Sequence, residues 1–481
     1  MMDFKKASEI ALNTAKSKGA SYADIRILNT EDENISTKNG VTELIEKSSS
    51  FGFGIRVIAD GAWGFASSPD LDEANLKKIA ELSVKIAKAS AKLKQKDLSL
   101  AQVDKTIDSY KTPVEKDPFT VPLKEKLDYL LYLDQLLRKT EGLTSTSAFI
   151  DFRKENSYFA SSEGSRIEQI IIHSGAGIEA LCMKSRKEMG KRSYPDSNGQ
   201  YESKGYELIN ELKFEDNCEK IAQQAISLLS AMECPSGIKT IVLDCSQLSL
   251  QIHESIGHPL ELDRVLGAEK NFSGTSFATL DKLNKLKYGS DIVNVVTDST
   301  YPGGLGTFGY DDEGVKAQRK DIIKNGILVG YLTSRETAPL IKTLSNGSMR
   351  ADGWGNMPII RMANTILLPG DKSFEELISE VDDGIYMETV SSWSIDDNRE
   401  SFKMGCQIGW EIKNGKLGKM IKNPTYSGTT VEFWNSCDAI SSEKYFKVWG
   451  TPNCGKGQPG QNARTGQGAS PARFKNVKVG N

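Results

Sequence analysis

The sequence predicts an α+β protein made of three consecutive units. Helical and β-prone segments are interleaved without the regular alternation of βαβ units, and composition changes along the chain. A length of 481 residues favours about three domains over one core. We expect an N-terminal mixed α/β domain over 1–120 with a linker from about 89, a middle α+β region over 121–234, and a predominantly β C-terminal domain over 235–481 that carries a short helix with two histidines.

The first unit is expected to hold two amphipathic helices around a β-hairpin. Apolar residues recur at helical spacing between Phe4 and Ala15, and Gly19 ends that pattern. A second stripe runs from Leu76 to Ala87. Between them, the segment FGFGIRVIADGAWGFAS has two β-prone runs around Asp60-Gly61, which is a strong turn signal. Residues from about 89 to 122 are rich in Lys, Ser, Gln, Asp and Pro and indicate a linker.

The middle unit is expected to be a helix followed by an antiparallel meander. Leucines between Leu123 and Leu137 form an apolar stripe directly after Pro122. The runs SYFASS and RIEQIIIHS flank Glu163-Gly164, which predicts neighbouring antiparallel strands. His173 in the second run is interpreted as a core or edge histidine. A further helix is expected near 221–229, and Cys-Pro-Ser-Gly at 234–237 marks a boundary.

The last unit begins with the apolar strand TIVLDC, and Ser246 is a candidate N-cap for the helix that follows. After about residue 290 the chain is rich in glycine, asparagine and short β-prone runs. One helix, SFEELISEVDDGI, is expected to interrupt them. These features predict a mostly β unit with its helix near the beginning.

Composition restricts the class of protein. The net charge of -3 leaves no general attraction for nucleic acid or anionic lipid. There is no run of about 18 apolar residues and no signal-peptide pattern, so we expect a cytoplasmic protein with no membrane partner. Seven cysteines without a C-x-x-C pair are expected to be reduced thiols, available in principle as metal ligands.

The segment HESIGH contains two of the three histidines in the chain, His253 and His258, with Glu254 beside the first. Imidazoles bind metals, and a neighbouring carboxylate can act as general base, so the pattern indicates a hydrolytic metal site. Five residues rotate by about 140° around a regular α-helix, which would separate the two rings. We therefore expect a break or π-bulge before Pro259. The alternative is that two histidines occur together by chance on a partly buried helix.

A catalytic zinc site needs a third protein ligand and keeps its fourth position for water. Nearby candidates are Glu261 and Asp263, and the cysteines are distant candidates. Glu254 is better placed as the base than as a ligand, because activated water needs a carboxylate to accept its proton.

Several motifs in order, HESIGHPLELD, FGYDDEG, RMANTILLPG and NCGKGQPGQ, together with GFGIRV and GAWGFASS near the start, resemble the TldD/PmbA family of metalloproteases. The intact H-E-x-x-x-H resembles the catalytic TldD type, since TldE (PmbA) relatives lack it. The resemblance implies Zn²⁺ held by His253, His258 and Cys454, with Glu254 as base. It also implies a homodimer, or a heterodimer with a TldE/PmbA-like subunit, that encloses the site in a cavity reached by a narrow cleft.

Two further groups are candidates for substrate binding. The acidic turn at 311–313 is either solvated, or orients a ligating histidine, or meets the amino terminus of a peptide through Asp312 or Glu313. Arg361 and Asn364 lie on an expected strand that could line a peptide cleft.

The functional prediction is a zinc metallopeptidase that hydrolyses peptides or unfolded polypeptide segments. The alternative is a noncatalytic assembly or regulatory protein with a structural zinc site, which would normally be closed by four protein ligands. Regulation of a DNA-associated enzyme is disfavoured, because the chain has no basic stripe.

Overall fold

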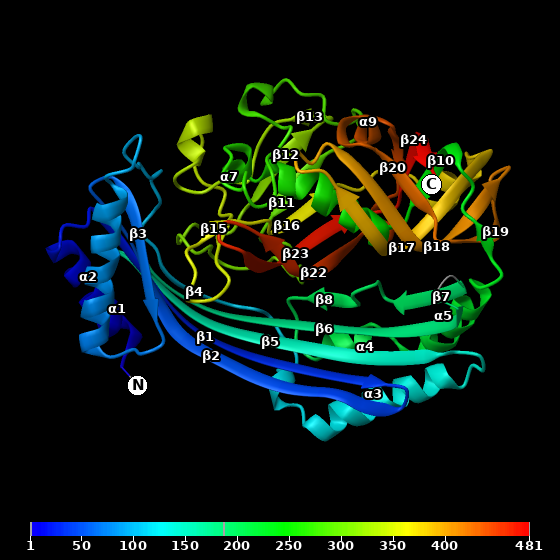
Figure 1. Ribbon diagram of the computed structural model, residues 1–481, viewed down its shortest axis with the longest axis horizontal. Coiled ribbons are helices and arrows are strands. Elements are labelled where there is room, and N and C mark those ends of the chain that lie inside the picture. The colour runs from blue at the N-terminus through cyan, green and yellow to red at the C-terminus, as the bar shows by residue number, and fades with distance from the viewer. Residues whose placement is uncertain (1, 186–187, 481) are drawn as a thin grey trace.

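One mixed sheet of eight strands runs through the first half of the chain. The computed structural model describes residues 2–185 and 188–480, and its long strands form a curved sheet under the C-terminal half (Figure 1). The main strand order is β3-β2-β1-β5-β6-β4, with β7 and β8 paired to β6. These strands are β1 (Tyr22–Lys38), β2 (Val41–Ala59), β3 (Ala62–Ser68), β4 (Ile107–Lys111), β5 (Ser145–Ser161), β6 (Arg166–Ser185), β7 (Glu188–Tyr194) and β8 (Gln200–Glu202).

Helices cover the outer face of this sheet in two groups. The pair α1 and α2 packs on β1, β2 and β3, while α3 packs on β1 and β5 and α5 packs on β6 and β7. Apolar faces of these helices and strands form two separate cores. The elements are α1 (Phe4–Ser17), α2 (Glu73–Ser90), η1 (Pro118–Thr120), α3 (Leu123–Arg138), α4 (Glu207–Glu211) and α5 (Glu215–Ser227).

The C-terminal half contains two larger sheets and a two-stranded ribbon. The eight-stranded sheet comprises β9 (Met232–Glu233), β10 (Gly237–Leu243), β17 (Asp383–Ile395), β18 (Ser401–Lys413), β19 (Lys416–Lys422), β20 (Thr425–Thr429), β21 (Cys437–Ile440) and β24 (Ala472–Val479). The six-stranded sheet comprises β11 (Val295–Asp298), β12 (Arg319–Lys324), β13 (Ile327–Leu328), β16 (Asn364–Leu367), β22 (Lys447–Lys456) and β23 (Gln461–Ala469). The ribbon is β14 (Met349–Arg350) with β15 (Ile359–Ile360).

A short helix, α6 (Cys245–Ile252), connects the two larger sheets. It contacts β17 of one sheet and β16, β22 and β23 of the other. Leu248, Ile252 and Ile256 follow one helical ridge and are fully buried in the core of this half. The remaining short helices are η2 (His253–Gly257), η3 (His258–Leu260), α7 (Leu262–Val265), η4 (Leu280–Lys282), η5 (Ala338–Ile341), α8 (Phe374–Ser379), α9 (Thr430–Asn435) and η6 (Glu443–Tyr445).

The predicted α+β class is confirmed, and local predictions agree with the structure in most places. Asp60 and Gly61 both have positive φ at the turn between β2 and β3, as a tight hairpin requires. The expected linker contains β4, which pairs in parallel with β6. The boundary expected near residue 120 lies between β1 and β5 in the sequence. Because these two strands pair with each other, the boundary falls within one sheet. The three-unit division stays a prediction.

Over 2–185 and 188–480, no helix is both long and apolar enough to cross a bilayer.

Candidate metal centre

The helix that carries the histidines changes its geometry where the five-residue spacing requires it. α6 ends at Ile252, a π-helical turn follows over His253–Gly257, and a 3₁₀ turn begins at His258. The amide of His258 donates to the carbonyl of His253, five residues earlier. The two imidazoles therefore lie together, with centroids 4.8 Å apart and planes at 85°. The predicted π-bulge is confirmed.

Two residues of this segment have specific structural roles. The N-cap of α6 is Asp244 rather than the expected Ser246, because the Asp244 carboxylate accepts the Ser246 amide at 2.9 Å. Gly257 permits close packing: a Cβ there would lie 2.0 Å from the sulfur of Met362. A side chain at this position would displace Met362 or the turn between the histidines.

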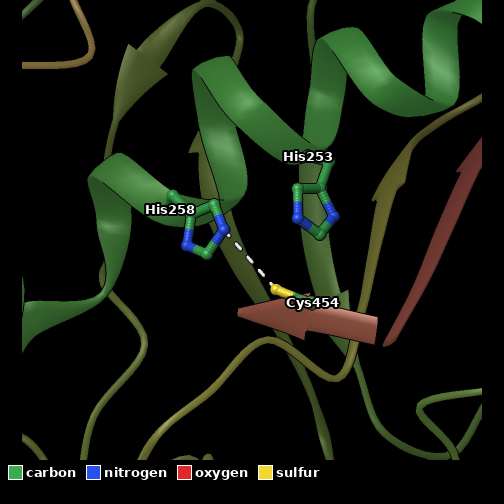
Figure 2. A group of neighbouring side chains, drawn as sticks. All are labelled: His253, His258 and Cys454. Carbon is green, nitrogen blue, oxygen red and sulfur yellow. Dashed lines mark hydrogen bonds between the residues drawn. The ribbon is translucent and has the colours of Figure 1, made fainter. Parts of the chain in front are cut away.

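Cys454 joins the two histidines from a distant part of the chain. It lies on β22, next to an irregularity in the pairing of β22 with β23. Its sulfur is 3.5 Å from Nε2 of His258, and one donor atom from each of the three residues lies within 4.8 Å of the others. Figure 2 shows both rings above the thiol. All three side chains are buried.

The donor set fits a metal cation. Burial raises the pKa of Cys454, but the charges of His253 and His258 outweigh it and hold that pKa well below its usual value, which favours the thiolate. Nδ1 of His253 is buried and has no hydrogen-bond partner among the described residues. Two imidazoles and a thiolate are ligands typical of zinc, and a three-residue set leaves one coordination position for water.

Glu261 orients the second histidine. Its Oε2 lies 2.9 Å from Nδ1 of His258, so the opposite ring nitrogen faces Cys454. Burial alone would raise the pKa of Glu261, but Lys456 and His258 lower it. Burial lowers the pKa of His258, whereas Cys454 and Glu261 raise it to about 9. A metal ion bound at this ring would therefore displace a proton at neutral pH.

Glu261 and Asp263, the two nearby carboxylates that the sequence offers as third ligands, both have other partners. Glu261 contacts His258 on the side away from Cys454, and it also lies 3.4 Å from Nζ of Lys456. Asp263 accepts from Lys456 at 2.6 Å. Within the described residues, neither belongs to the group that gathers around the thiol. Cys454 is therefore the third donor that the geometry favours.

Glu254 is 6% exposed and forms an ion pair with Arg399. Burial raises the pKa of Glu254, but the charges of His253, His258 and Arg399 lower it below the usual value. The carboxylate is therefore ionised at neutral pH, as a proton acceptor must be.

The predicted substrate-binding residues of the acidic turn connect the two halves of the molecule. Asp312 lies 3.2 Å from Arg26 of β1 and also lines a cavity of about 320 Å³ between the halves. Glu313 lies 3.1 Å from Arg56 of β2, and both side chains are buried. Among the described residues, neither carboxylate contacts His253 or His258; the carboxylate that does is Glu261.

Arg361 and Asn364 support the main chain around the site. Arg361 donates to the carbonyl of Cys454 at 2.5 Å and to that of Gln461 at 3.1 Å. Asn364 is fully buried and donates to the carbonyl of Asp298 at 2.8 Å. Substrate contact by Asp312, Glu313, Arg361 and Asn364 stays a prediction.

Arg399 and Lys456 were not recognised from sequence. Arg399 is separated from Glu254 by 145 residues, and no local pattern connects them. Lys456 lies two residues after Cys454 and has four partners among the described residues: it donates to the Asp263 carboxylate and the Ile360 carbonyl, and it lies 3.4 Å from Glu261 and 3.6 Å from Glu269. In the sequence, the position of Lys456 two residues after Cys454 is the signal that could have identified it.

Comparison with known proteins gives matches along nearly the whole chain. Models of the PmbA/TldA metallopeptidase domain 1, central domain and C-terminal domain match residues 23–87, 116–232 and 236–481. A metalloprotease of Methanocaldococcus jannaschii is 32% identical over 94% of this chain and 95% of its own length. A metalloprotease of Methanothermobacter thermautotrophicus is 29% identical over 95% of each chain.

The fold is also similar to a solved structure. TldE from Thermococcus kodakarensis superposes with a TM-score of 0.72, at 16% identity, over 99% of this chain and 100% of that one. At 16% identity this superposition shows a shared fold and no more. The evidence for a family comes from the sequence matches to all three domain models. The chain belongs to the PmbA/TldD family of metallopeptidases.

Proposed function

We propose that this protein is a zinc peptidase that hydrolyses peptides or unfolded polypeptide segments. The observation that carries the proposal is the buried group of His253, His258 and Cys454, with the ionised Glu254 next to the first ligand. Membership of a metallopeptidase family supports the reaction class. The donor set supports zinc, because thiolate and imidazole ligands with an open position are typical of catalytic zinc.

His253, His258 and Cys454 would hold the ion, and Glu261 would fix the ring of His258. Bound zinc would supply Lewis acidity, polarising the scissile carbonyl and acidifying water. Glu254 accepts a proton as the water oxygen forms its bond to the carbonyl carbon and the π electron pair moves to the carbonyl oxygen. The same proton then passes to the amide nitrogen as the C–N bond breaks, which yields a carboxylic acid and an amine.

The substrate and partner proposals rest on the family and on the surroundings of the site. We propose a peptide bound near Asp312, Glu313, Arg361 and Asn364, and a dimer with a second copy or with a TldE/PmbA-like subunit. The fold's similarity to TldE supports such a pairing, since two chains of one shape can form a pseudo-symmetric dimer. A cytoplasmic location without membrane or nucleic-acid partners is proposed from composition.

Digestion of a peptide library tests the proposal. The purified protein, alone and coexpressed with a TldE-like chain, is analysed for metal and incubated with the library before and after chelation. Hydrolysis should require bound zinc and return when zinc is restored to the chelated protein. A fully zinc-loaded protein that cleaves nothing in either assembly would favour the structural-zinc alternative. Against that alternative, the described residues supply a donor group of three members rather than four.

A further inference from the structure

Arg399 closes the hairpin turn between β17 and β18: its amide donates to the carbonyl of Asp396 at 3.0 Å. It lies in the loop between β17 and β18, after the last pair Ile395–Phe402, and has φ of 63°. Residues other than Gly, Asn and Asp rarely adopt this left-handed backbone conformation. A glycine would satisfy the same turn at lower conformational cost.

The loop that carries Arg399 is bound firmly to the catalytic half. The carbonyls of Asp397 and Asn398 accept from the amides of Thr275 and Phe277 at 2.9 and 3.0 Å. The carbonyl of Arg399 itself accepts from the hydroxyl of Thr430 at 2.7 Å. The main chain on both sides of the arginine therefore fixes where its side chain can reach.

The guanidinium reaches the proposed base. Nη1 of Arg399 donates to Oε2 of Glu254, and the arginine side chain is 13% exposed. Its Nε is buried without a hydrogen-bond partner among the described residues. A buried, unpaired donor on a charged group is costly, and such groups in native structures call for an explanation. A guanidinium has five N–H donors in a fixed fork, so one contact with Glu254 leaves others free.

The unused donor belongs to the group that contacts the proposed base, and peptide hydrolysis creates negative charge next to that base. A water held by Glu254 lies about 3 Å from the carboxylate, and the carbonyl it attacks is adjacent. A guanidinium bonded to the same carboxylate is therefore within one side-chain movement of the carbonyl oxygen. During attack, negative charge develops on that oxygen, and a preorganised cation in a water-poor site stabilises it strongly.

We propose that Arg399 is a catalytic residue that donates a hydrogen bond to the scissile carbonyl oxygen as its negative charge develops. The inference rests on the proposed function, because it requires Glu254 to act at the reacting water. Arg399 gives up no proton: it stabilises the electron pair that moves onto the carbonyl oxygen when the water oxygen bonds to carbon. Its contact with Glu254 holds it beside the reaction before substrate arrives.

Kinetics and ligand binding with Arg399→Lys and Arg399→Gln test the role. For a peptide that the wild type cleaves, kcat should fall about 10²–10³-fold in Arg399→Gln, as for loss of one oxyanion donor, while KM changes little. Calorimetry should show a comparable loss of affinity for an anionic phosphinic peptide, which mimics the tetrahedral state, and little change for an uncleavable neutral peptide analogue. Arg399→Lys should recover part of both losses. Zinc content and circular dichroism should equal those of the wild type.

Asn398→Ala is the matched control. It alters the same loop by removing the acceptor of the Thr275 hydroxyl, at 2.8 Å, and leaves the guanidinium in place. It should retain kcat and phosphinic-peptide affinity. An equal loss in Asn398→Ala would show that loop integrity is the cause and overturn the proposal. Arg399 variants that raise KM at constant kcat, or lose only peptides with a free C-terminal carboxylate, would also overturn it, because they identify a substrate anchor.

Failure of the inference and failure of the proposed function give different results. If the wild type hydrolyses peptides and both Arg399 variants match it in kcat and phosphinic-peptide affinity, the role of Arg399 is wrong and the peptidase proposal stands. If the zinc-loaded wild type cleaves no peptide and does not bind the phosphinic peptide, both fail.

Discussion

Oε2 of Glu261 lies 2.9 Å from Nδ1 of His258, and this contact determines which ring nitrogen faces the thiolate of Cys454. Glu261 itself is fully buried and is held by Lys456 at 3.4 Å. The carboxylate, the histidine and the cysteine thus form a continuous polar chain. Supporting carboxylates of this kind raise the basicity of a histidine ligand and restrict its orientation.

Glu261→Gln should weaken zinc binding about 10–100-fold, because the isosteric amide keeps its shape but loses the charge that supports His258. Competition with a chromophoric chelator measures this affinity. Asp263→Asn is the matched control, since Asp263 contacts Lys456 but neither histidine. Unchanged affinity in Glu261→Gln would contradict a supporting role.

Glu254→Ala should abolish peptide hydrolysis while zinc remains bound. Removal of a general base typically costs about 10²–10⁴-fold in rate, and Glu254 is outside the donor group. Parallel measurement of turnover and of zinc by mass spectrometry separates the two effects. Hydrolysis at the wild-type rate would rule out this assignment.

Cys454→Ser and His258→Ala should each lower the zinc content of the purified protein. Both changes remove one of three donors, and a hydroxyl is a poorer zinc ligand than a thiolate. Cys182→Ser is the control, because that buried thiol lies on β6 and donates to the carbonyl of Gly142. Full occupancy in either site variant would remove that residue from the ligand set.

Asp196 should make stability depend on pH. Burial is the main cause that raises the pKa of Asp196 to about 7, from an ordinary value of 3.8. Between these values the unfolded chain releases the proton and the folded protein keeps it, so folding stability falls as pH rises from about 4 to about 7 and then levels off. Each unit of difference corresponds to about 1.4 kcal/mol.

Urea unfolding at several pH values between 5 and 8 measures this dependence. Asp196→Asn has no titrating carboxyl, and its amide oxygen can still accept from the amide of Val390, which lies 3.2 Å from Asp196. The variant should therefore lose less stability than the wild type as pH rises. Identical slopes for both proteins would show that other groups control this range.

Arg56→Met should destabilise the contact between the two halves of the molecule. Arg56 lies 2.8 Å from Asp24 and 3.1 Å from Glu313, with all three side chains buried. Loss of the cation leaves two buried carboxylates without their main partner, which typically costs about 3–5 kcal/mol. Urea unfolding measures the loss. Lys77→Met, which breaks an exposed pair with Glu73, should cost less than about 1 kcal/mol.

Local sequence patterns predicted the local structure well. The five-residue spacing of His253 and His258, followed by Pro259, predicted a departure from α geometry, and a π turn forms there. The Asp60-Gly61 signal predicted a hairpin that is present. These features depend on interactions between residues close in the chain. Cys454 was identified through motif resemblance, and its 3.5 Å approach to His258 required the fold.

The fold class, the distorted histidine turn and the family of this protein can all be predicted from the residues in order, because each depends on periodicity, spacing or motif order. Three other features become visible in the folded chain alone: β1 pairs with β5 across the expected linker, Glu261 supports His258, and Arg399 reaches Glu254. Pairing of distant strands and contacts between buried side chains depend on packing in three dimensions. A single sequence carries no local pattern for the 145-residue separation between Arg399 and its carboxylate partner.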